Sequence, residues 1–365
     1  MEIAAIILVL LLAFANGAND VSKSAATLVG GQLTHYSQAL RWGSLWTTVG
    51  ALLGGVLASG LAARFADALG PEGHEQAAIP IAVLIGAMLW VGLSSRLGLP
   101  VSTTHAIAGA ILGVGWVAQG LSPWARHDVL AGFFIPLLAS PFMALALLRL
   151  LSPLLRKLQS QLDQRCVCVV PSEPSPASPA GGTAMAASAT SVVLDRKENC
   201  KGLSLWSWNL SLDSAHWASS ALLSLCRGMN DAPKIWALCF PLLALGGMQG
   251  TNYFLLVALV AVAMGAGSLL GGRKVSVVLA ERVTRMNPAQ SLGANLTAAL
   301  LVGAATAFAL PVSTTHVSSG AIIGVGLEGS KKNLRWRVVA EMVSAWVVTL
   351  PVTAAVAAGF YLLLR

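Results

Sequence analysis

The sequence predicts an all-α polytopic membrane protein built from two inverted-topology repeats. Its composition supports the membrane class, because 56% of the 365 residues are hydrophobic and only 10% are charged. A soluble protein carries roughly 25% charged residues, so a large soluble core would lack the charged surface that it needs. A duplicated motif supports the repeats: "LPVSTTHAIAGAILGVG" at 99–115 returns as "LPVSTTHVSSGAIIGVG" at 310–326.

Ten apolar segments follow one another along the chain, and most have the ~20 residues that a helix needs to cross a bilayer. They are 2–30, 40–62, 77–96, 100–118, 129–150, 214–246, 252–271, 289–309, 312–327 and 338–363. The first and the sixth are overlong, and we expect the Asn-Asp dipeptides at 19–20 and 230–231 to interrupt them. The pairs within 77–118 and 289–327 either cross fully or form broken, re-entrant hairpins at the midplane. Both readings give the same topology, because each pair leaves from the side that it entered.

The basic residues predict the orientation. If the segments alternate from an outside N-terminus, four loops face the cytoplasm, and with their flanks these hold most of the 23 Lys and Arg residues. The loops are 31–39, 151–213, 272–288 and 328–337. The positive-inside bias therefore predicts a protein of the cell membrane with both termini outside. It also assigns the net charge of +8 to the lipid bilayer rather than to nucleic acid.

The repeated motifs keep one register. Pro100 and Pro311 are 211 residues apart, and the same offset takes Asp20 onto Asp231. Five segments per half is an odd number, so the second half must enter the membrane from the opposite side. Secondary transporters use inverted repeats of this kind. A duplicated membrane scaffold that transports nothing is the alternative.

Three regions follow from this register: a first membrane repeat at 1–150, a cytoplasmic linker at 151–213 and a second membrane repeat at 214–365. The Pro- and Ser-rich stretch at 171–191 has too few bulky apolar residues to pack, so we expect a largely disordered linker. The cysteines of the linker lack a fourth ligand at the spacing of a metal site. We therefore expect neither a bound metal nor a cofactor beyond a coupling ion.

The Pro-Val-Ser-Thr-Thr-His motifs predict an anion site. Each places hydroxyl groups and a helix N-terminus inside an apolar run, and the free N–H groups and dipole of such a terminus attract anions. Irregular backbone at membrane depth persists only where it lines a cavity. An ordinary helix cap at the membrane surface is the alternative. The candidate anion ligands are Ser102, Thr103, Thr104, Ser313, Thr314 and Thr315.

Two histidines close these motifs. His105 and His316 each follow a serine by three residues, and either a proton-carrying or a structural role fits them. Serine, histidine and aspartate together also fit an intramembrane hydrolase. A hydrolase needs one nucleophile, however, whereas this chain carries two equivalent sets and no G-x-S-x-G elbow.

Ionisable residues within membrane segments mark functional sites by default. Asn19, Asp20, Asn230 and Asp231 offer carboxylate and amide oxygens that suit a hard cation such as Na⁺, and a carboxylate could equally carry a proton. Lys23 and Lys234 each lie one helical turn after an aspartate, either as its ion-pair partner or facing a dianion. Two Asp and two Lys residues would give this site a formal charge near zero.

At these residues the chain resembles the PiT family of inorganic phosphate transporters. The family carries a G-A-N-D-type and a P-V-S-T-T-H-type signature in each inverted half, found here at 17–20, 228–231, 100–105 and 311–316. The resemblance implies phosphate import by H⁺ or Na⁺ symport, with phosphate between the Ser-Thr-Thr turns and the cation near the aspartates. It also implies a homodimer. A sulfate permease of the same fold is the runner-up, because some relatives in the family move sulfate.

The chain departs from the family pattern at the lysines. Lys23 and Lys234 stand where the first signature of the family commonly has Asn, and Met229 stands for Ala. A fixed ammonium group near a cation site can replace a bound Na⁺, which favours proton coupling. A phosphate ligand must donate its O–H to an acceptor such as Asp20 or Asp231, and sulfate has no such proton, which favours phosphate.

Overall fold

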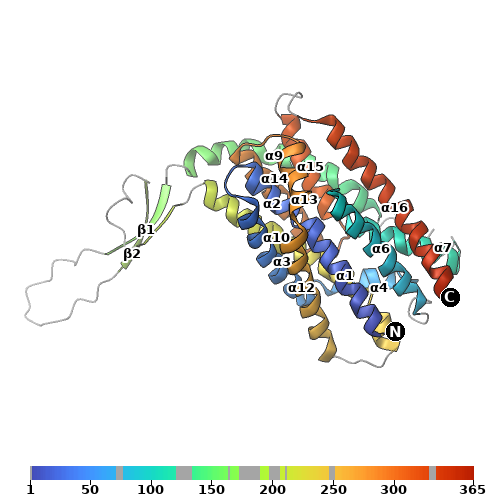
Figure 1. The fold of residues 1–365 in the computed structure, drawn as a ribbon. Coiled ribbons are helices and arrows are strands. Elements are labelled where there is room, and N and C mark those ends of the chain that lie inside the picture. Colours follow the sequence, from blue (N-terminus) through green and yellow to red (C-terminus); the bar gives the residue numbers. More distant parts are fainter. Residues whose placement is uncertain are drawn as a thin grey trace, which may run out of the picture.

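The computed structural model describes nine stretches of the chain: residues 2–70, 77–120, 134–162, 165–171, 190–196, 206–209, 212–245, 251–328 and 334–365. Helices pack into one elongated bundle, and a small sheet lies apart from one end of it (Figure 1). Both termini lie at the opposite end of the bundle (Figure 1). The prediction of an all-α membrane fold is confirmed for the bundle.

The first half supplies the helices that come before the linker. They are α1 (Glu2–Asp20), α2 (Ser22–Gly30), α3 (Tyr36–Leu57), α4 (Ser59–Asp67), α6 (Ala78–Leu97), α7 (Thr103–Gln119) and α9 (Ile135–Leu162). The second half supplies α10 (Leu212–Ala237), α11 (Phe240–Leu245), α12 (Thr251–Gly271), α13 (Arg273–Val277), a short π-helix (Val278–Arg282), α14 (Pro288–Ala307), α15 (Thr314–Glu328) and α16 (Trp336–Leu364).

Among the described residues, five helical segments are long and apolar enough to cross a membrane, or six if α3 and α4, bent by 76°, form one span. The five are Ile3–Gly30, Ala78–Leu97, Ile135–Leu155, Tyr253–Gly271 and Trp336–Leu364. The other predicted segments form helices that are shorter or more polar. Helices α10, α14 and α15 carry charged or hydroxyl side chains that are buried in the bundle. Their low hydropathy therefore reflects a central position.

The first Asn-Asp dipeptide is followed by an interruption of one residue only, across which the segment Ile3–Gly30 remains a single span, and the second dipeptide interrupts nothing. Helix α1 ends at Asp20, Val21 has no helical assignment, and α2 begins at Ser22. Helix α10 instead continues through residues 230–231 and contains Pro233 before it ends at Ala237. The prediction was wrong at this site because Asn230 bonds to Thr306 and Asp231 to Lys234 while both stay in helical geometry, so neither side chain has to interrupt the helix.

The packing of the helices repeats at the offset of 211 residues. Helix α1 packs on α12, and its counterpart α10 packs on α3, the counterpart of α12. Likewise α7 packs on α16, and α15 packs on α9. Each half therefore packs its helices against those of the other, as two repeats related by a twofold axis would.

Glycines of the Asn-Asp motifs allow close contacts between these helices. A Cβ at Gly17 would strike the backbone of Met264 in α12, and a Cβ at its counterpart Gly228 would strike the backbone of Thr47 in α3. Only glycine permits so close an approach of two helix backbones. These contacts hold α1 and α10 in the centre of the bundle.

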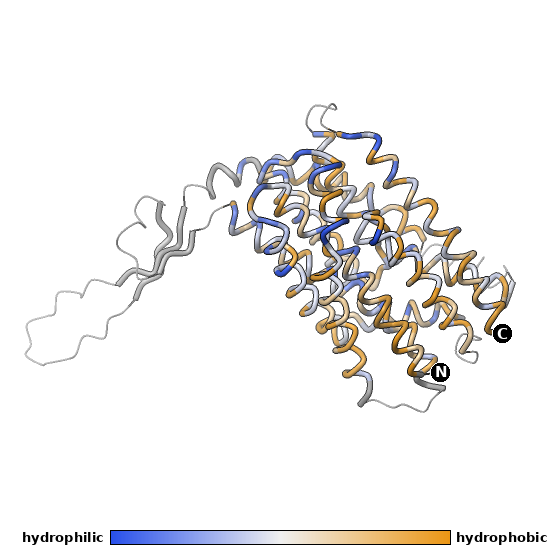
Figure 2. Tube along the Cα trace, in the orientation of Figure 1, coloured by the Kyte–Doolittle hydropathy of each residue, from blue (hydrophilic) through white to orange (hydrophobic). Residues whose placement is uncertain are grey.

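Hydrophobic residues run along most of the bundle, and hydrophilic ones gather at the end where the linker leaves it (Figure 2). Buried apolar side chains form two large clusters. One involves α1, α6, α7 and α12, and the other α9, α14 and α15. Polar side chains are buried between them, and these form the candidate site.

The linker contains a sheet that the sequence reading did not anticipate. Strands β1 (Arg165–Pro171), β2 (Thr190–Arg196) and β3 (Trp206–Asn209) pair antiparallel in the order β2-β1-β3. β1 and β2 are rich in valine, which favours strands, and they flank the Pro- and Ser-rich stretch. Residues 172–189, on which the prediction of disorder rested, lie outside the described residues.

Candidate functional site

Two helix N-termini meet in the interior of the bundle. Helix α7 begins at Thr103, and the hydroxyl of Ser102 accepts a hydrogen bond from His105 N at 3.1 Å. Helix α15 begins at Thr314, and Ser313 accepts from His316 N at the same distance. The two serines therefore cap their helices, which is the alternative role considered from the sequence. Because all these residues are buried, the caps lie inside the bundle and not at its surface.

The threonines join one motif to the other. Thr104 Oγ1 donates a hydrogen bond to Val312 O at 3.3 Å, and its counterpart Thr315 Oγ1 donates to Val101 O at 2.8 Å. Each hydroxyl thus satisfies a backbone carbonyl in the extended segment before the other helix. The structure brings the two predicted turns into direct contact.

Each lysine forms an ion pair with the aspartate of its own motif and reaches a threonine of the other half. Lys23 Nζ contacts Asp20 and donates to Thr314 Oγ1 at 3.1 Å. Lys234 Nζ lies 3.2 Å from Asp231 and donates to Thr104 Oγ1 at 2.8 Å. One bond runs from the first half to the second and the other from the second to the first, so the lysines connect the two halves at the site.

The two carboxylates meet at a single hydroxyl group. Thr314 Oγ1 lies 3.2 Å from Asp20 Oδ2 and 3.3 Å from Asp231 Oδ2. No more than 2% of either aspartate is exposed. A hydroxyl has one proton, so Thr314 can donate to only one of the carboxylates at a time while it accepts from Lys23. This hydroxyl is the common centre of both motifs.

The motif asparagines fix the backbone around this centre. Asn19 Nδ2 donates to Ser95 Oγ at 3.1 Å and to Leu99 O at 2.9 Å. Its counterpart Asn230 Nδ2 donates to Thr306 Oγ1 at 2.9 Å, and Thr306 stands at the repeat position of Ser95. The amide groups therefore anchor α1 to α6 and α10 to α14. Their oxygens are also bonded, because Asn19 Oδ1 accepts from Val101 N at 3.3 Å and Asn230 Oδ1 accepts from Lys234 Nζ.

The sequence reading missed Asn16, one helical turn before Asp20. Asn16 Nδ2 donates to Asp20 Oδ2 at 3.2 Å and to Thr103 Oγ1 at 3.0 Å. Spacing could have revealed it, because residues four apart share one face of a helix. Asn16 thus supports the carboxylate of the first motif directly.

The reading also missed Arg227, which stands at the repeat position of Asn16. Its side chain is 1% exposed and lies within electrostatic range of Asp20 and Asp231. Nη2 contacts Thr47 Oγ1, whereas Nε and Nη1 have no hydrogen-bond partner within the described part of the chain. A buried guanidinium with two free donors is suited to a planar or tetrahedral anion.

Arg227 corrects the expected charge of the site. Lys23, Lys234 and Arg227 face Asp20 and Asp231, so the formal charge is one positive unit rather than near zero. Uncompensated charge is costly in a low-dielectric interior. An anion therefore gains from entering this site.

The rings of the two histidines contact each other at a tilt of 46° beside the caps. The ring centroids of His105 and His316 are 4.2 Å apart, and His316 also packs on Trp346 at 4.1 Å. His105 Nδ1 lies 2.9 Å from Ser102 Oγ, and Trp346 Nε1 donates to Pro100 O at 3.2 Å. These contacts hold the two helix N-termini at a fixed spacing.

The described residues hold no group of three His, Cys, Asp or Glu side chains that could bind a metal ion. The hard ligands of the site are instead the two carboxylates and the neighbouring amide and hydroxyl oxygens. They lie beside the ammonium groups and Arg227. The arrangement can therefore hold an anion together with a proton or a small monovalent cation.

An apolar bundle that buries such a charged centre between two helix N-termini has the construction of a membrane transporter. A sequence model described as "Phosphate transporter family" matches residues 16–357, and the chain belongs to this family. It is a transporter rather than an enzyme.

Individual relatives agree with the family. A protein of Rhizobium meliloti named "Probable low-affinity inorganic phosphate transporter" is 27% identical over 354 residues, which cover 95% of this chain and 92% of the relative. One of the same name from Bacillus subtilis is 25% identical over 356 residues, covering 96% and 93%. A solved structure titled "The sodium-dependent phosphate transporter" matches with a TM-score of 0.75 and 21% identity, covering 100% of this chain and 98% of the other. At that identity the structure supports the fold alone.

Proposed function

We propose that this protein imports inorganic phosphate across the cell membrane by symport with a cation, and that the substrate binds where the two motifs meet. The observation that carries the proposal is Thr314 Oγ1, which lies within hydrogen-bonding distance of both aspartates and of Lys23. A ligand that displaces this hydroxyl meets acceptors and donors at once. Phosphate needs both, since it presents an O–H group and anionic oxygens.

The residues divide by chemistry. Lys23, Lys234 and Arg227 supply positive charge, and Thr103, Thr104, Thr314 and Thr315 supply hydroxyl groups to the anion. Asp20 or Asp231 accepts the O–H of a phosphate, and sulfate lacks this proton. This difference favours phosphate over sulfate as the substrate.

We further propose that protons are the coupling ions. In the described structure the ammonium groups of Lys23 and Lys234 already lie against Asp20 and Asp231, on the oxygens that would coordinate Na⁺. A bound Na⁺ would have to displace an ammonium group, whereas a proton can add to a carboxylate without leaving the ion-pair geometry. The solved relative is titled sodium-dependent, so coupling would differ between the two proteins.

Uptake into proteoliposomes tests these statements together. Purified protein is given labelled phosphate or labelled sulfate, with a Na⁺ gradient, a pH gradient or neither. The expected result is concentrative phosphate uptake that a pH gradient drives without Na⁺. Saturable sulfate uptake that exceeds phosphate uptake would transfer the proposal to the sulfate permease. No accumulation of either anion under any gradient would favour the scaffold.

The proposal includes the orientation, with both termini outside and the linker in the cytoplasm, and a homodimer by analogy with the family. Single cysteines placed at residue 365 and in the linker can be labelled in whole cells with a membrane-impermeant maleimide. Labelling at the terminus and protection of the linker are expected. The reverse pattern would reject the orientation and leave the site geometry untouched.

A further inference from the structure

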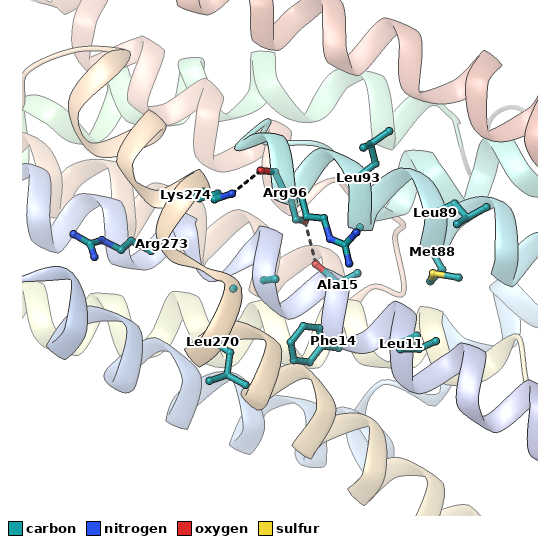
Figure 3. Close-up of a pocket in the computed structure, with 14 residues that line it drawn as sticks. Leu11, Phe14, Ala15, Met88, Leu89, Leu93, Arg96, Leu270, Arg273 and Lys274 are labelled. Carbon is teal, nitrogen blue, oxygen red and sulfur yellow. Dashed lines mark hydrogen bonds between the residues drawn. The ribbon is translucent and has the colours of Figure 1, made fainter.

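A cleft of about 830 Å³ lies on the outside of the bundle between α1, α6 and α12, and it reaches the start of α13. Its walls are mostly apolar. They include Leu11, Phe14, Met88, Leu89, Leu93 and Leu270. Figure 3 shows these side chains along the helices that border the cleft.

The cleft opens to the surroundings of the bundle and not to the buried site. Leu89, Leu93 and Leu270 on its walls are 45%, 52% and 75% exposed. They belong to helices that are long and apolar enough to cross a membrane. In a bilayer this opening would face acyl chains.

Three basic residues line the same cleft: Arg96 at the end of α6, and Arg273 and Lys274 at the start of α13. Figure 3 shows Arg273 and Lys274 toward one end of the cleft, and Met88 and Leu89 toward the other. Lys274 Nζ donates to Arg96 O at 3.1 Å, which joins α13 to α6. No acidic residue lines the cleft, and within the described stretches none of the three bases forms an ion pair.

We propose that this cleft binds an anionic glycerophospholipid, with its phosphate at the basic end beside Arg96 and Lys274 and an acyl chain along the apolar wall. Basic pockets between membrane helices bind anionic head groups in this way. A neutral lipid would leave three cations without counter-charge. Free phosphate would bind the basic residues and leave the apolar walls uncovered. A lipid would contact both, so it fits the cleft better.

A hydrogen bond connects the wall of the cleft to the buried site. Ser95 lines the cleft and accepts the hydrogen bond from Asn19 Nδ2 at 3.1 Å. A lipid seated there contacts α1 and α6, the two helices that this bond joins. Lipid binding does not depend on which anion the protein transports. The rate of uptake should nevertheless change when the lipid is bound.

Two variants test the lipid site from its two ends. Arg96→Gln, Arg273→Gln and Lys274→Gln together remove the charge. Gly92→Leu fills the apolar end, because an added Cβ at Gly92 meets no atom within 4 Å and the larger side chain enters open space. The matched controls are Arg285→Gln, an exposed base outside the cleft, and Gly359→Leu on α16, where an added Cβ also meets nothing.

The measurement is lipid retained by the purified protein after exchange into mixed phosphatidylglycerol and phosphatidylcholine, quantified by native mass spectrometry. The wild type and both controls should retain phosphatidylglycerol preferentially. The triple variant should lose this preference by about tenfold or more, as removal of three cations predicts. Gly92→Leu should lose bound lipid of both kinds.

Four results would overturn the proposal. One is equal retention of the two lipids by the wild type; another is unchanged retention in both test variants. The third is a cross-link between cysteines placed at Leu89 of two copies, with loss of the dimer in Gly92→Leu, which would assign the cleft to a subunit interface. The fourth result comes from competition with millimolar inorganic phosphate. If phosphate displaces the lipid from the wild type, and Gly92→Leu retains as much lipid as the wild type, the basic residues bind free phosphate and the apolar walls bind nothing. Thermal unfolding of each variant establishes that it is folded.

Discussion

The two halves of the molecule are nearly identical at the motifs and differ one helical turn away. Thr104 and Thr315 make matching bonds in both directions, whereas Lys23 donates to Thr314 and Lys234 to Thr104, which are not repeat counterparts. At the next turn the first half has Asn16, which bonds to Asp20, and the second has Arg227, which carries two free donors. The repeat therefore supplies the same residue types to the centre from both halves, and Arg227 in place of Asn16 gives the second half one more positive charge.

A second difference separates α6 and α7 from α14 and α15. The first pair contributes Leu84 and Ile107 to the large apolar cluster. At the repeat positions the second pair has Asn295 and Ser318, whose side-chain polar atoms are buried and have no partner among the described residues. Such groups are normally satisfied by protein or by water. The first half thus packs these positions with apolar side chains, whereas the second half buries polar groups there.

The largest effect is expected at Thr314, where the two motifs meet. Asp20→Asn and Asp231→Asn should each abolish concentrative phosphate uptake, because each removes a carboxylate from Thr314 and leaves a buried lysine unpaired. Removal of one partner from a buried pair costs about 3–5 kcal/mol, so folding must be checked by thermal unfolding. The double variants Asp20→Asn with Lys23→Asn, and Asp231→Asn with Lys234→Asn, restore charge balance and serve as folding controls. Full concentrative uptake by either single variant would reject the coupling role.

The next effect concerns the lysines. Lys23→Asn with Lys234→Asn removes two positive charges and should raise the phosphate KM by tenfold or more, or create Na⁺ dependence, since hydrogen bonds to charged groups contribute about 1.5–3 kcal/mol each. The measurement is uptake against Na⁺ concentration for the wild type and the double variant. If the wild type already requires Na⁺ steeply and the two curves coincide, the lysines serve only as partners of the aspartates.

Arg227→Asn tests the asymmetry directly, because it gives the second half the residue of the first. We expect a KM for phosphate about tenfold higher, from the loss of one charged donor, with the maximal rate largely retained. Thr47→Val is the matched control, since it removes the hydroxyl that Arg227 contacts and keeps the charge. A similar KM change in both variants would mean that Arg227 acts through packing on α3.

The smallest effect is expected from Asn295→Leu, which copies Leu84 into the second half. Uptake should slow by a few-fold while thermal stability stays equal or rises by about 1 kcal/mol, because an unpaired buried amide is removed. Ser44→Ala, another buried hydroxyl without a partner but on α3, should leave uptake unchanged. An unchanged rate in Asn295→Leu would show that this polar side carries no substrate.

Much of the fold could be predicted from the sequence, because the lengths of the apolar segments and the offset between the repeats are visible without knowledge of the tertiary structure. The meeting of the two threonine turns followed from the same offset. The continuity of α10 did not, since the packing that tolerates Pro233 comes from helices far away in the chain. Arg227 was missed although two signals were present, because it is ionisable within a membrane segment and lies four residues before Asp231, the spacing of Asn16 and Asp20. The linker strands were missed because the Pro- and Ser-rich composition of 171–191 led to a prediction of disorder that was extended to the flanking valine-rich segments.

The exchanged packing of α7 with α16 and of α9 with α15 has a consequence for assembly. Neither half can complete its own bundle, because the last helix of each covers a motif helix of the other. The packing between helices, rather than the covalent linker, then holds the two halves together. The polypeptide could be divided within it, and the two fragments, produced in the same cell, should find each other and form the intact transporter.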